Sequence, residues 1–319
     1  MRGDAQPDRC LESGLNSFWP SNSRAMRIAL ATCSNLPSFE VDDRPLIDAL
    51  EARGAEVHRP SWDDRAVDWR AMDACLIRTT WDYMDRCDEF VAWAERAASL
   101  TKLFNSSAVV RWNTDKRYLR ELEEDGVACV PTLWLDRGTA PDVGAMARER
   151  GWDRAFLKPT VGASASGTFR FETDAAGVGA ATEHLAELLP EQSFMLQPYL
   201  HSVETAGELS AVIVDGQLTH GVRKVPVKGD YRVQDDYGAT DELFEFAPDE
   251  SALSHRIVDL ASERLGERGL LYARVDYLRS EDGELLLNEL ELVEPSMFFR
   301  HAPEAAAALA TSLLARLES

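Results

Sequence analysis

Strand-like and helix-like segments alternate along residues 26–112. Residues 27–32 (RIALAT) form an apolar run of strand length, and the following RPLIDALEARG has the periodicity of a helix that ends at Gly54. AEVHRP, DACLIRTTWDY and KLFN are further strand candidates, and DEFVAWAERAASL is amphipathic. Because this alternation favours parallel strands, we expect an α/β layer in which ligands bind at the carboxyl ends of the strands. The segment RTTWDY (Arg78–Tyr83) falls at one such end.

Beyond residue 113 the pattern changes. We expect a helix over 114–124, then strands at VPTLWL, AFLKP, TFRFE and SFMLQPYL, with a polar helix before AFLKP and a helix over 175–189 before SFMLQPYL. This part of the chain therefore predicts a second unit of mixed helices and strands.

The C-terminal part contains two predicted hairpins. Asp215-Gly216 lies between the strand candidates ELSAVIV and QLTHGVRKVPV, and Asp282-Gly283 lies between LLYARVDYL and ELLLNELEL. Asp-Gly between two apolar runs is a strong short-range signal for a hairpin turn. We expect a loop over 228–240, a helix over 251–268 between the hairpins, and an alanine-rich final helix.

The composition excludes several classes of protein. The formal net charge is −21 and no Lys/Arg-rich run occurs, so nucleic acid and anionic membranes are not expected partners. No apolar stretch is long enough to cross a bilayer. Residues 1–25 lack the apolar core of a signal peptide; we expect a disordered leader or an upstream start codon, with Met26 as the start. Five scattered cysteines without a CxxC motif favour reduced thiols in the cytoplasm.

A loop of small residues follows Lys158 in FLKPTVGASASGT. Glycine and small side chains let backbone N–H groups approach an anion, so Gly162–Thr168 predicts a phosphate-binding nest. It is not a Walker A loop, because no lysine follows Gly167 and the next segment, TFRFE, is a strand candidate. A strand–loop–strand with a lysine on the first strand indicates a mobile lid over a nucleotide triphosphate; the alternative is a flexible surface hairpin.

The second predicted hairpin carries four charged residues of special interest. Arg274 and Asp276 are two apart on one strand, and Glu289 and Glu291 are two apart on the next, so each pair projects from one face. Carboxylates gathered in this way suit Mg²⁺, which prefers oxygen ligands and joins carboxylates to substrate phosphates. Arg274 beside them would stabilise charge on a transferring phosphoryl group. The alternative is a solvated strand face in an acidic protein.

Lysine is rare in this chain, with five residues against 29 arginines. Lys116 in NTDK, Lys158 before the small-residue loop, and Lys224 and Lys228 in GVRKVPVKGD lie where a phosphate or carboxylate could bind. The alternative is that these lysines are chance survivors. Their placement adds weight to an anion-binding site.

The order of these motifs resembles the ATP-grasp superfamily of carboxylate–amine ligases, over roughly residues 26–319. The motifs are Lys116, Lys158, the small-residue loop, LQPYL, GELS, RVD, and an E-x-E thirteen residues after the aspartate. The chain is similar to D-alanine–D-alanine ligases and to the RimK and glutathione synthetase types. RTTWDY, WNTDKRYL, FLKPTVGASASGT and NELELVEPS look more closely like a bacterial subfamily that includes the O-ureido-serine cyclo-ligase of cycloserine biosynthesis.

The resemblance implies an α/β (α+β) ATP-grasp fold whose parts clasp ATP. We expect the disordered leader over 1–25, an α/β pre-ATP-grasp domain over 26–112, a lid subdomain over 113–200 and a C-terminal core subdomain over 201–319. A homodimer is common among such ligases.

The resemblance also implies roles for the matching residues. Asp276, Glu289 and Glu291 would hold one or two Mg²⁺, and Arg274 would bind the γ-phosphate and an acyl phosphate. The expected ATP-binding residues are Lys116 and Lys158 at the phosphates, Gly162, Ala163, Ser164, Ala165, Ser166, Gly167 and Thr168 in the covering loop, Gln197, Pro198, Tyr199 and Leu200 beside adenine, and Glu208 near the ribose. Many relatives have asparagine in place of Glu291, and Pro-Gly after it. Here ELVEPS is one residue longer, so we expect Ser296 to bind the transition-state oxygen.

The substrate residues are predicted with alternatives. Arg78 could pair with a substrate carboxylate and Trp81 could stack on the substrate; alternatively Trp81 is packed and Arg78 forms a structural pair with Asp82. Arg223 and Lys224 are expected to face the site, where they would bind a carboxylate or the triphosphate.

These expectations lead to one main hypothesis. An ATP-dependent ligase would phosphorylate a small amino-acid-like carboxylate, and a nitrogen nucleophile, from another molecule or by ring closure, would displace the phosphate. The alternatives are a ligase that modifies a peptide, and a non-catalytic ATP-binding regulatory protein. All of them require the hairpin acids to lie in one cleft with Lys116 and Lys158.

Overall fold

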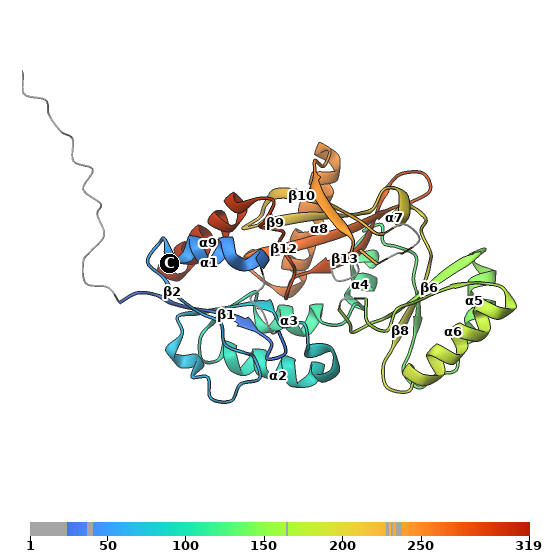
Figure 1. Cartoon of the computed structure of the whole chain (residues 1–319), viewed down its shortest axis with the longest axis horizontal. Helices are drawn as coiled ribbons and strands as arrows, with labels where there is room; N and C mark the ends of the chain where they lie inside the picture. The colour runs from blue at the N-terminus through green and yellow to red at the C-terminus, as the bar shows by residue number, and fades with distance from the viewer. Residues whose placement is uncertain (1–23, 37–40, 164, 228–229, 231, 234–237) are drawn as a thin grey trace, which may run out of the picture.

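The chain folds around three β-sheets (Figure 1). The computed structural model describes residues 24–36, 41–163, 165–227, 230, 232–233 and 238–319. Most of the expected leader, together with Ser164 and Lys228, lies outside these residues. Within the described part of the chain, every helix is too short or too polar to cross a bilayer.

The N-terminal sheet is parallel throughout, in the order β2-β1-β3-β4. Its elements are β1 (Arg27–Thr32), α1 (Arg44–Glu51), β2 (Glu56–His58), β3 (Ala74–Thr79), α2 (Cys87–Ala98) and β4 (Lys102–Phe104), with short 3-10 helices at Val41–Asp43, Trp69–Ala71 and Tyr83–Arg86. β3 is buried along its whole length, as expected for a strand covered on both faces. The predicted parallel α/β layer is confirmed.

The second sheet is antiparallel, in the order β5-β8-β6-β7 (Figure 1, right). Its elements are β5 (Leu133–Leu135), α5 (Val143–Glu149), β6 (Arg154–Pro159), β7 (Phe169–Glu172), α6 (Ala175–Leu188) and β8 (Phe194–Pro198). The two helices share a hydrophobic core with the sheet. β6 alternates partly and fully buried residues, so the side chain of Lys158 projects from the face opposite that core.

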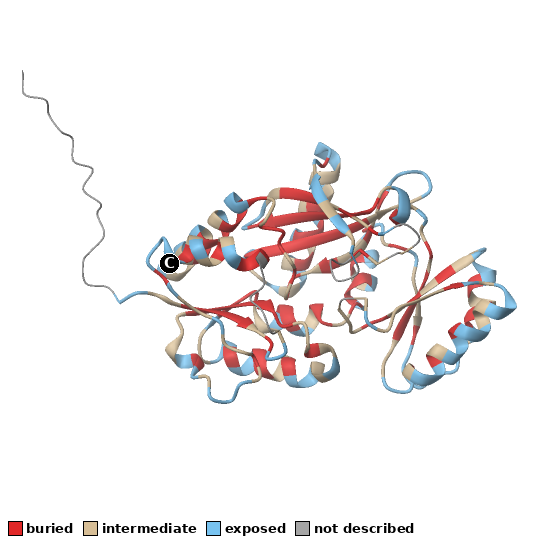
Figure 2. Ribbon diagram, viewed as in Figure 1, coloured by how far each residue is buried: buried red, intermediate tan, exposed pale blue. Residues whose placement is uncertain are grey.

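The third sheet has five antiparallel strands, in the order β11-β10-β9-β12-β13. Its strands and the helices of this region are α3 (Ser107–Asn113), α4 (Tyr118–Glu124), α7 (Ser202–Thr205), β9 (Glu208–Val214), β10 (Gln217–Val225), β11 (Thr240–Phe244), α8 (Pro248–Leu265), β12 (Tyr272–Arg279), β13 (Leu285–Glu291) and α9 (Pro303–Glu318). α4 and α8 share one core with β9, β12 and β13. Figure 2 shows the central strands of this sheet as mostly buried.

Helix α9 ties the third sheet to the N-terminal sheet. Leu309 and Leu313 on α9 pack in the same core as Leu46 and Leu50 on α1, and all four side chains are fully buried. Side chains of β1, β3, β9 and β10 belong to that core as well. The two sheets therefore share a hydrophobic core.

Both predicted hairpins are present, and their register sets the site. Asp215 and Gly216 have φ values of 50° and 75°, a combination that favours glycine and aspartate in a two-residue turn. In the second hairpin, Arg274 pairs with Glu291 and Asp276 pairs with Glu289. The four charged side chains predicted to lie together are thus neighbours across two strands.

Two elements differ from the expectations. The helix predicted over 114–124 is α4, which begins four residues later, at Tyr118. α3 was not predicted; Ser106 caps it by accepting a hydrogen bond from Val109 N. β11 begins at Thr240, the last residue of the segment expected to be a loop. Its sequence, TDELF, lacks the alternation of apolar and polar residues that marks a half-buried strand. It is an edge strand, and all its side chains are exposed or half-buried.

Candidate active site

A cavity of about 310 Å³ lies at the junction of the three sheets. Its wall comes from segments far apart in the sequence: the β6–β7 loop, the end of β8, the strands β9, β10, β12 and β13, and the segment after β3. The predicted site residues on its wall are Trp81, Lys116, Lys158, Gly162, Ala163, Ala165, Ser166, Thr168, Gln197, Pro198, Tyr199, Leu200, Glu208, Lys224, Arg274, Asp276, Glu289, Glu291 and Ser296.

Glu289 binds both lysines that the sequence singles out. Lys116 Nζ lies 3.0 Å from Glu289 Oε1, and Lys158 Nζ lies 2.9 Å from Oε2. Lys116 also donates to the carbonyl oxygen of Gly162 at 2.6 Å, and its own N–H donates to Thr160 O at 2.8 Å. Burial alone would raise the pKa of Glu289, but the two ammonium groups hold it well below the ordinary value. The acid of one sheet and the lysines of two other elements therefore meet in the cavity.

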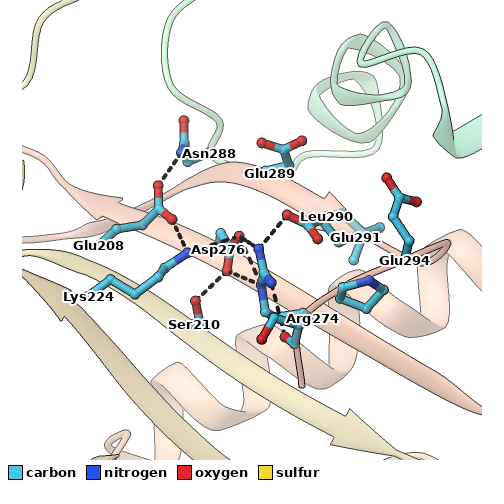
Figure 3. A network of polar contacts seen from close by, with 12 residues as sticks. Glu208, Ser210, Lys224, Arg274, Asp276, Asn288, Glu289, Leu290, Glu291 and Glu294 are labelled. Carbon is cyan, nitrogen blue, oxygen red and sulfur yellow. Dashed lines mark hydrogen bonds and ion pairs between the residues drawn. The ribbon is translucent and has the colours of Figure 1, made fainter. Parts of the chain in front are cut away.

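Arg274 and Asp276 form the centre of a second network (Figure 3). Arg274 donates to both Asp276 oxygens, with Nε 3.0 Å from Oδ1 and Nη2 2.8 Å from Oδ2. Ser210 Oγ donates to Asp276 Oδ1 at 2.5 Å, and Lys224 Nζ lies 3.5 Å from Oδ2. Lys224 also forms an ion pair with Glu208. Burial opposes ionisation of Asp276, but its cationic neighbours keep the pKa well below the ordinary value.

Glu291 and Glu294 lie beyond this network, next to the N-terminal sheet. Burial raises the pKa of Glu291, and its ion pair with Arg274 opposes that rise. Burial and the nearby Glu291 raise the pKa of Glu294 to about 8, and a hydrogen bond with Tyr83 opposes the rise. Trp81 Nε1 donates to the backbone oxygen of Glu294 at 3.1 Å. Glu294 and Tyr83 line the cavity but were not predicted as site residues; the only sequence signal was their place inside NELELVEPS and RTTWDY.

The segment after β13 is held by a carboxylate from the N-terminal layer. Asp42, which is 1% exposed, accepts hydrogen bonds from Ser296 Oγ at 3.1 Å and from Met297 N at 2.9 Å. Arg300 forms an ion pair with the same carboxylate at 3.3 Å. Phe298 has a φ of 51°, an uncommon conformation for a bulky residue, and its ring lies beneath the guanidinium groups of Arg274 and Arg300. Asp42 is a further site-supporting residue that the sequence did not reveal.

The opposite end of the cavity is less charged. Its wall includes Phe156, the segment 197–200, Val203 and Leu278. The side chain of Gln197 is engaged, since its Nε2 donates to Thr132 Oγ1 at 2.9 Å. The cavity therefore has an apolar end at β8 and a charged end at β12 and β13, which suits a ligand with an aromatic base and an anionic tail.

Five described residues of the small-residue loop line the cavity: Gly162, Ala163, Ala165, Ser166 and Thr168. Ala165 and Gly167 adopt positive φ values of 56° and 68°. A Cβ atom at Gly167 would lie 2.9 Å from Pro159 Cγ, so glycine suits both the backbone conformation and the close approach. Gly167 itself is not part of the wall; its carbonyl oxygen lies 2.9 Å from His184 Nε2.

Two predicted substrate residues lie outside the cavity wall. Arg78 is 2% exposed and forms an ion pair with Asp43 at 2.8 Å, while donating to Pro295 O at 3.1 Å. The expectation that Arg78 faces a substrate is therefore wrong. The alternative pairing with Asp82 is also wrong, because Asp82 accepts from Trp62 and pairs with Arg86 instead.

The expectation that Arg223 faces the cavity is wrong as well. Neighbouring residues on a strand point to opposite sides, so Lys224 lines the cavity while Arg223 pairs with Glu242 on the other face. The side chain of Arg223 is 39% exposed.

The carboxylates have the chemistry of a magnesium site, although each is ion-paired with a cationic side chain. Among the described residues, no three His, Cys, Asp or Glu side chains converge as ligands of one ion. Glu289 and Glu291 nevertheless project from the same face of β13 into the cavity, and they supply the oxygen donors that Mg²⁺ prefers. Asp276 lines the same wall but is enclosed by its donors.

Comparison with known proteins matches the chain in two blocks. The N-terminal domain of D-cycloserine synthetase DcsG matches residues 28–105, and the ATP-grasp domain of prokaryotic glutathione synthetase matches residues 141–297. The cycloserine biosynthesis protein DcsG of Streptomyces lavendulae is 30% identical over 310 residues, which cover 91% of this chain and 99% of that protein. A glutathione synthetase of Rhodopseudomonas palustris is 24% identical over 251 residues, 78% of this chain and 74% of that protein.

The similarity extends to three dimensions. The crystal structure of D-cycloserine synthetase DcsG superposes with a TM-score of 0.82 at 29% identity, covering 91% of this chain and 99% of that chain. The resemblance noted from the motifs is confirmed, including the subfamily to which it pointed. The chain belongs to the ATP-grasp family of ATP-dependent carboxylate–amine ligases.

Proposed function

We propose that the cavity binds ATP with Mg²⁺ and activates the carboxylate of a small amino acid for attack by a nitrogen atom. One observation carries this proposal. Glu289 lies between Lys116 and Lys158, on the same wall as Arg274 and Glu291, beneath a loop of small residues. Three cations and several oxygen donors around one cavity suit a magnesium–triphosphate.

ATP would lie along the cavity from its apolar end to its charged end. The adenine would bind at Gln197, Pro198, Tyr199 and Leu200, with the ribose near Glu208. The triphosphate would lie at the two lysines, beneath the loop over 162–168, whose N–H groups would face the phosphate oxygens.

Glu289, Glu291 and Asp276 would hold Mg²⁺. The ion would offset negative charge on the phosphate oxygens during transfer. Phosphate binding would also release Glu289 from its lysines, because the lysines would exchange one anion for another.

The reaction would proceed in two steps at the Arg274 end of the cavity. A substrate carboxylate oxygen attacks the γ-phosphorus, the bond to the ADP oxygen breaks, and an acyl phosphate forms. A nitrogen atom then attacks the acyl carbon, its proton is lost, and the carbon–oxygen bond to phosphate breaks. Arg274 would bind the transferring group, and the loop over 162–168 would exclude water. The Ser296 hydroxyl, which donates to Asp42 in the ligand-free structure, would turn from that carboxylate to face the oxyanion.

We propose ring closure of an O-ureido-serine-like acid as the specific reaction. The support is the likeness to D-cycloserine synthetase over both matched blocks. The substrate end of the cavity is walled by Trp81, Tyr83 and Phe298, which favours a small molecule.

The test is product analysis with the purified chain and Mg·ATP. The panel contains D- and L-O-ureido-serine, amino-acid pairs and a short peptide, and the readouts are ADP, phosphate and the mass of the product. ADP and phosphate in equal amounts with a cyclic product support the proposal. Turnover only with the peptide would favour a peptide ligase, and tight ATP binding without turnover on any acid would favour a regulatory protein.

The proposal extends to the organisation of the molecule. We propose the α/β domain over 26–112, a lid subdomain within 113–200 and a core subdomain over 201–319. Because α4 packs with α8, we place the start of the lid nearer to β5.

Cytoplasmic location is supported by free thiols at Cys33, Cys75, Cys87 and Cys129. A homodimer stays a prediction that light scattering would test.

A further inference from the structure

Glu294 is the acid of the cavity wall that differs from all the others. The wall carries five described carboxylates: Glu208, Asp276, Glu289, Glu291 and Glu294. The first four each form an ion pair with a lysine or arginine. Among the described residues, Glu294 has no such cation within 4.0 Å.

The neighbours of Glu294 hold its carboxylate without neutralising it. Tyr83 lines the cavity with Glu294, and its hydroxyl acts to lower the pKa of the Glu294 carboxyl. The Trp81 indole donates to the backbone oxygen of Glu294 at 3.1 Å. Glu291 and Glu289 add negative charge nearby. Lys116, a cation that lowers the pKa of Glu294, is already bound to Glu289. In Figure 3 the Glu294 carboxylate projects from the segment after β13 on the same side as that of Glu289. A cation that binds beside Glu294 would therefore favour the ionised form of its carboxyl group.

Glu294 lies at the end of the cavity where the substrate would bind. The lysines and Arg274 surround the proposed triphosphate and the reacting carboxylate, and Glu294 lies past Glu291, toward Trp81 and Tyr83 of the N-terminal layer. An amino acid whose carboxylate meets Arg274 carries its ammonium group on the adjacent carbon. We propose that Glu294, beside Tyr83 on the cavity wall, binds the substrate's α-ammonium group and so makes this enzyme specific for acids that carry a free amino group.

This proposal rests on the proposed function, since it assumes that the reacting carboxylate binds at Arg274. It has a physical basis in the state of Glu294, whose pKa is raised to about 8 by burial and by Glu291. A bound ammonium group would favour the ionised carboxylate and would form charge-assisted hydrogen bonds with it. An acid without the amino group would leave Glu294 buried and without a cation, and would bind more weakly.

The test compares two acids on two proteins by calorimetric titration. Wild type and Glu294→Gln, both saturated with Mg·AMP-PNP, are titrated with O-ureido-serine (each enantiomer) and with 3-(ureidooxy)propanoate, which lacks only the amino group. For wild type we expect one enantiomer to bind at least about tenfold more tightly than the des-amino acid, the size of a hydrogen bond to a charged group. For Glu294→Gln we expect the two affinities to agree within about threefold, because the charge-assisted bond is gone.

Matched variants separate this role from others. Glu263→Gln, an exposed position on α8, should keep the wild-type preference, and Tyr83→Phe should weaken the preference without changing nucleotide affinity. Equal affinity of wild type for both acids, no binding of either acid to the nucleotide-loaded enzyme, or a full preference in Glu294→Gln would overturn the proposal. If Glu294→Gln lost turnover but kept the wild-type affinity for both acids, the proposal would also be overturned, since Glu294 would then act as a proton acceptor. Failure of wild type to bind Mg·AMP-PNP would instead reject the proposed function.

Discussion

The charged residues of this site pair with one another in the ligand-free structure. Glu289 occupies the ammonium groups of Lys116 and Lys158, and Arg274 is shared by Asp276 and Glu291. Breaking a buried pair by removing one partner is costly because the other charge stays buried. Each charge is thus held in place before ATP arrives, and a phosphate or metal ion can replace a partner without creating a bare charge.

Glu289→Gln should separate nucleotide binding from catalysis. The substitution removes the anion that competes with phosphate for two lysines, so ATP affinity in EDTA should stay the same or rise. It also removes a proposed magnesium ligand, and metal stabilisation of the transition state is worth several kcal/mol, so turnover with Mg²⁺ should fall at least about a hundredfold. Fluorescence titration and an ADP-release assay measure the two effects, with Glu187→Gln on exposed α6 as the control. Weaker ATP binding in EDTA would contradict this view of Glu289.

Glu294 should make the stability of the ligand-free protein depend on pH. Its pKa rises from an ordinary 4.5 to about 8 on folding, so the folded state binds more protons than the unfolded state between these values. Its contribution is therefore fully present below pH 4.5 and is lost as the pH rises through 8. Glu294→Gln should melt at a higher temperature than wild type at pH 9, and the difference should vanish near pH 4.5. A constant difference across this range would show that Glu294 is not buried in its acid form.

Site residues on the hairpin strands could be predicted from the sequence, because strand periodicity fixes the direction in which a side chain points. Asp276 and Glu289 were placed together by the hairpin alone, and their pairing in the register agrees. Arg78 shows the limit, because its partner Asp43 lies 35 residues away and no local pattern links them. Glu294 follows the strand in an irregular segment, where periodicity no longer gives direction.

At the scale of elements, helices and strands with an apolar face, and hairpins with a clear turn sequence, could be predicted from the sequence. The hairpin at Asp215-Gly216 is an example, because the turn requires residues that accept positive φ. β11 was not predicted, because it gains its hydrogen bonds from β10 rather than from apolar burial of its own side chains. Edge strands of this kind depend on a neighbour that only the folded chain supplies.

Substitutions at two glycines would test how closely β9 and β10 must approach each other at the site. Gly207 and Gly216 both have positive φ, at 77° and 75°, but a Cβ at Gly207 would lie 2.5 Å from Lys224 O, while one at Gly216 would meet nothing within 4 Å. Gly216→Ala should lose about 1–2 kcal/mol of unfolding free energy from backbone strain alone. Gly207→Ala should lose more and should also weaken nucleotide binding, because Lys224 must shift away from Glu208 and Asp276.

Denaturant unfolding and nucleotide titration of the two glycine variants measure these effects. Equal losses of stability, with equal nucleotide affinity, would mean that the approach of β9 to β10 at Gly207 has no part in arranging the site.

At the scale of the whole molecule, the cavity exists only because three sheets meet. The second sheet supplies Lys158, the third sheet supplies the acids, and the N-terminal layer supplies Trp81 and Tyr83. The first and third sheets share a core through α1 and α9. The second sheet has a core of its own, formed with α5 and α6, and only Met195 and Trp134 of its described residues pack in the core of the third sheet. From this packing we expect the second sheet to move relative to the other two sheets and to close over the cavity as a lid.

Nucleotide binding should therefore slow amide hydrogen exchange in the second sheet more than in the other two sheets. With Mg·AMP-PNP, amide hydrogen exchange should slow in β6 and β7 and in the residues of the loop between them, because these amides would face the phosphates or lie beneath the closed lid. Exchange in β1 and β3 should stay the same, since that sheet is already buried within the core shared with α9. EDTA should abolish most of the protection, because without Mg²⁺ the phosphates and the hairpin acids repel each other. Protection spread evenly over all three sheets would indicate general stabilisation by the ligand, and would contradict closure of a lid.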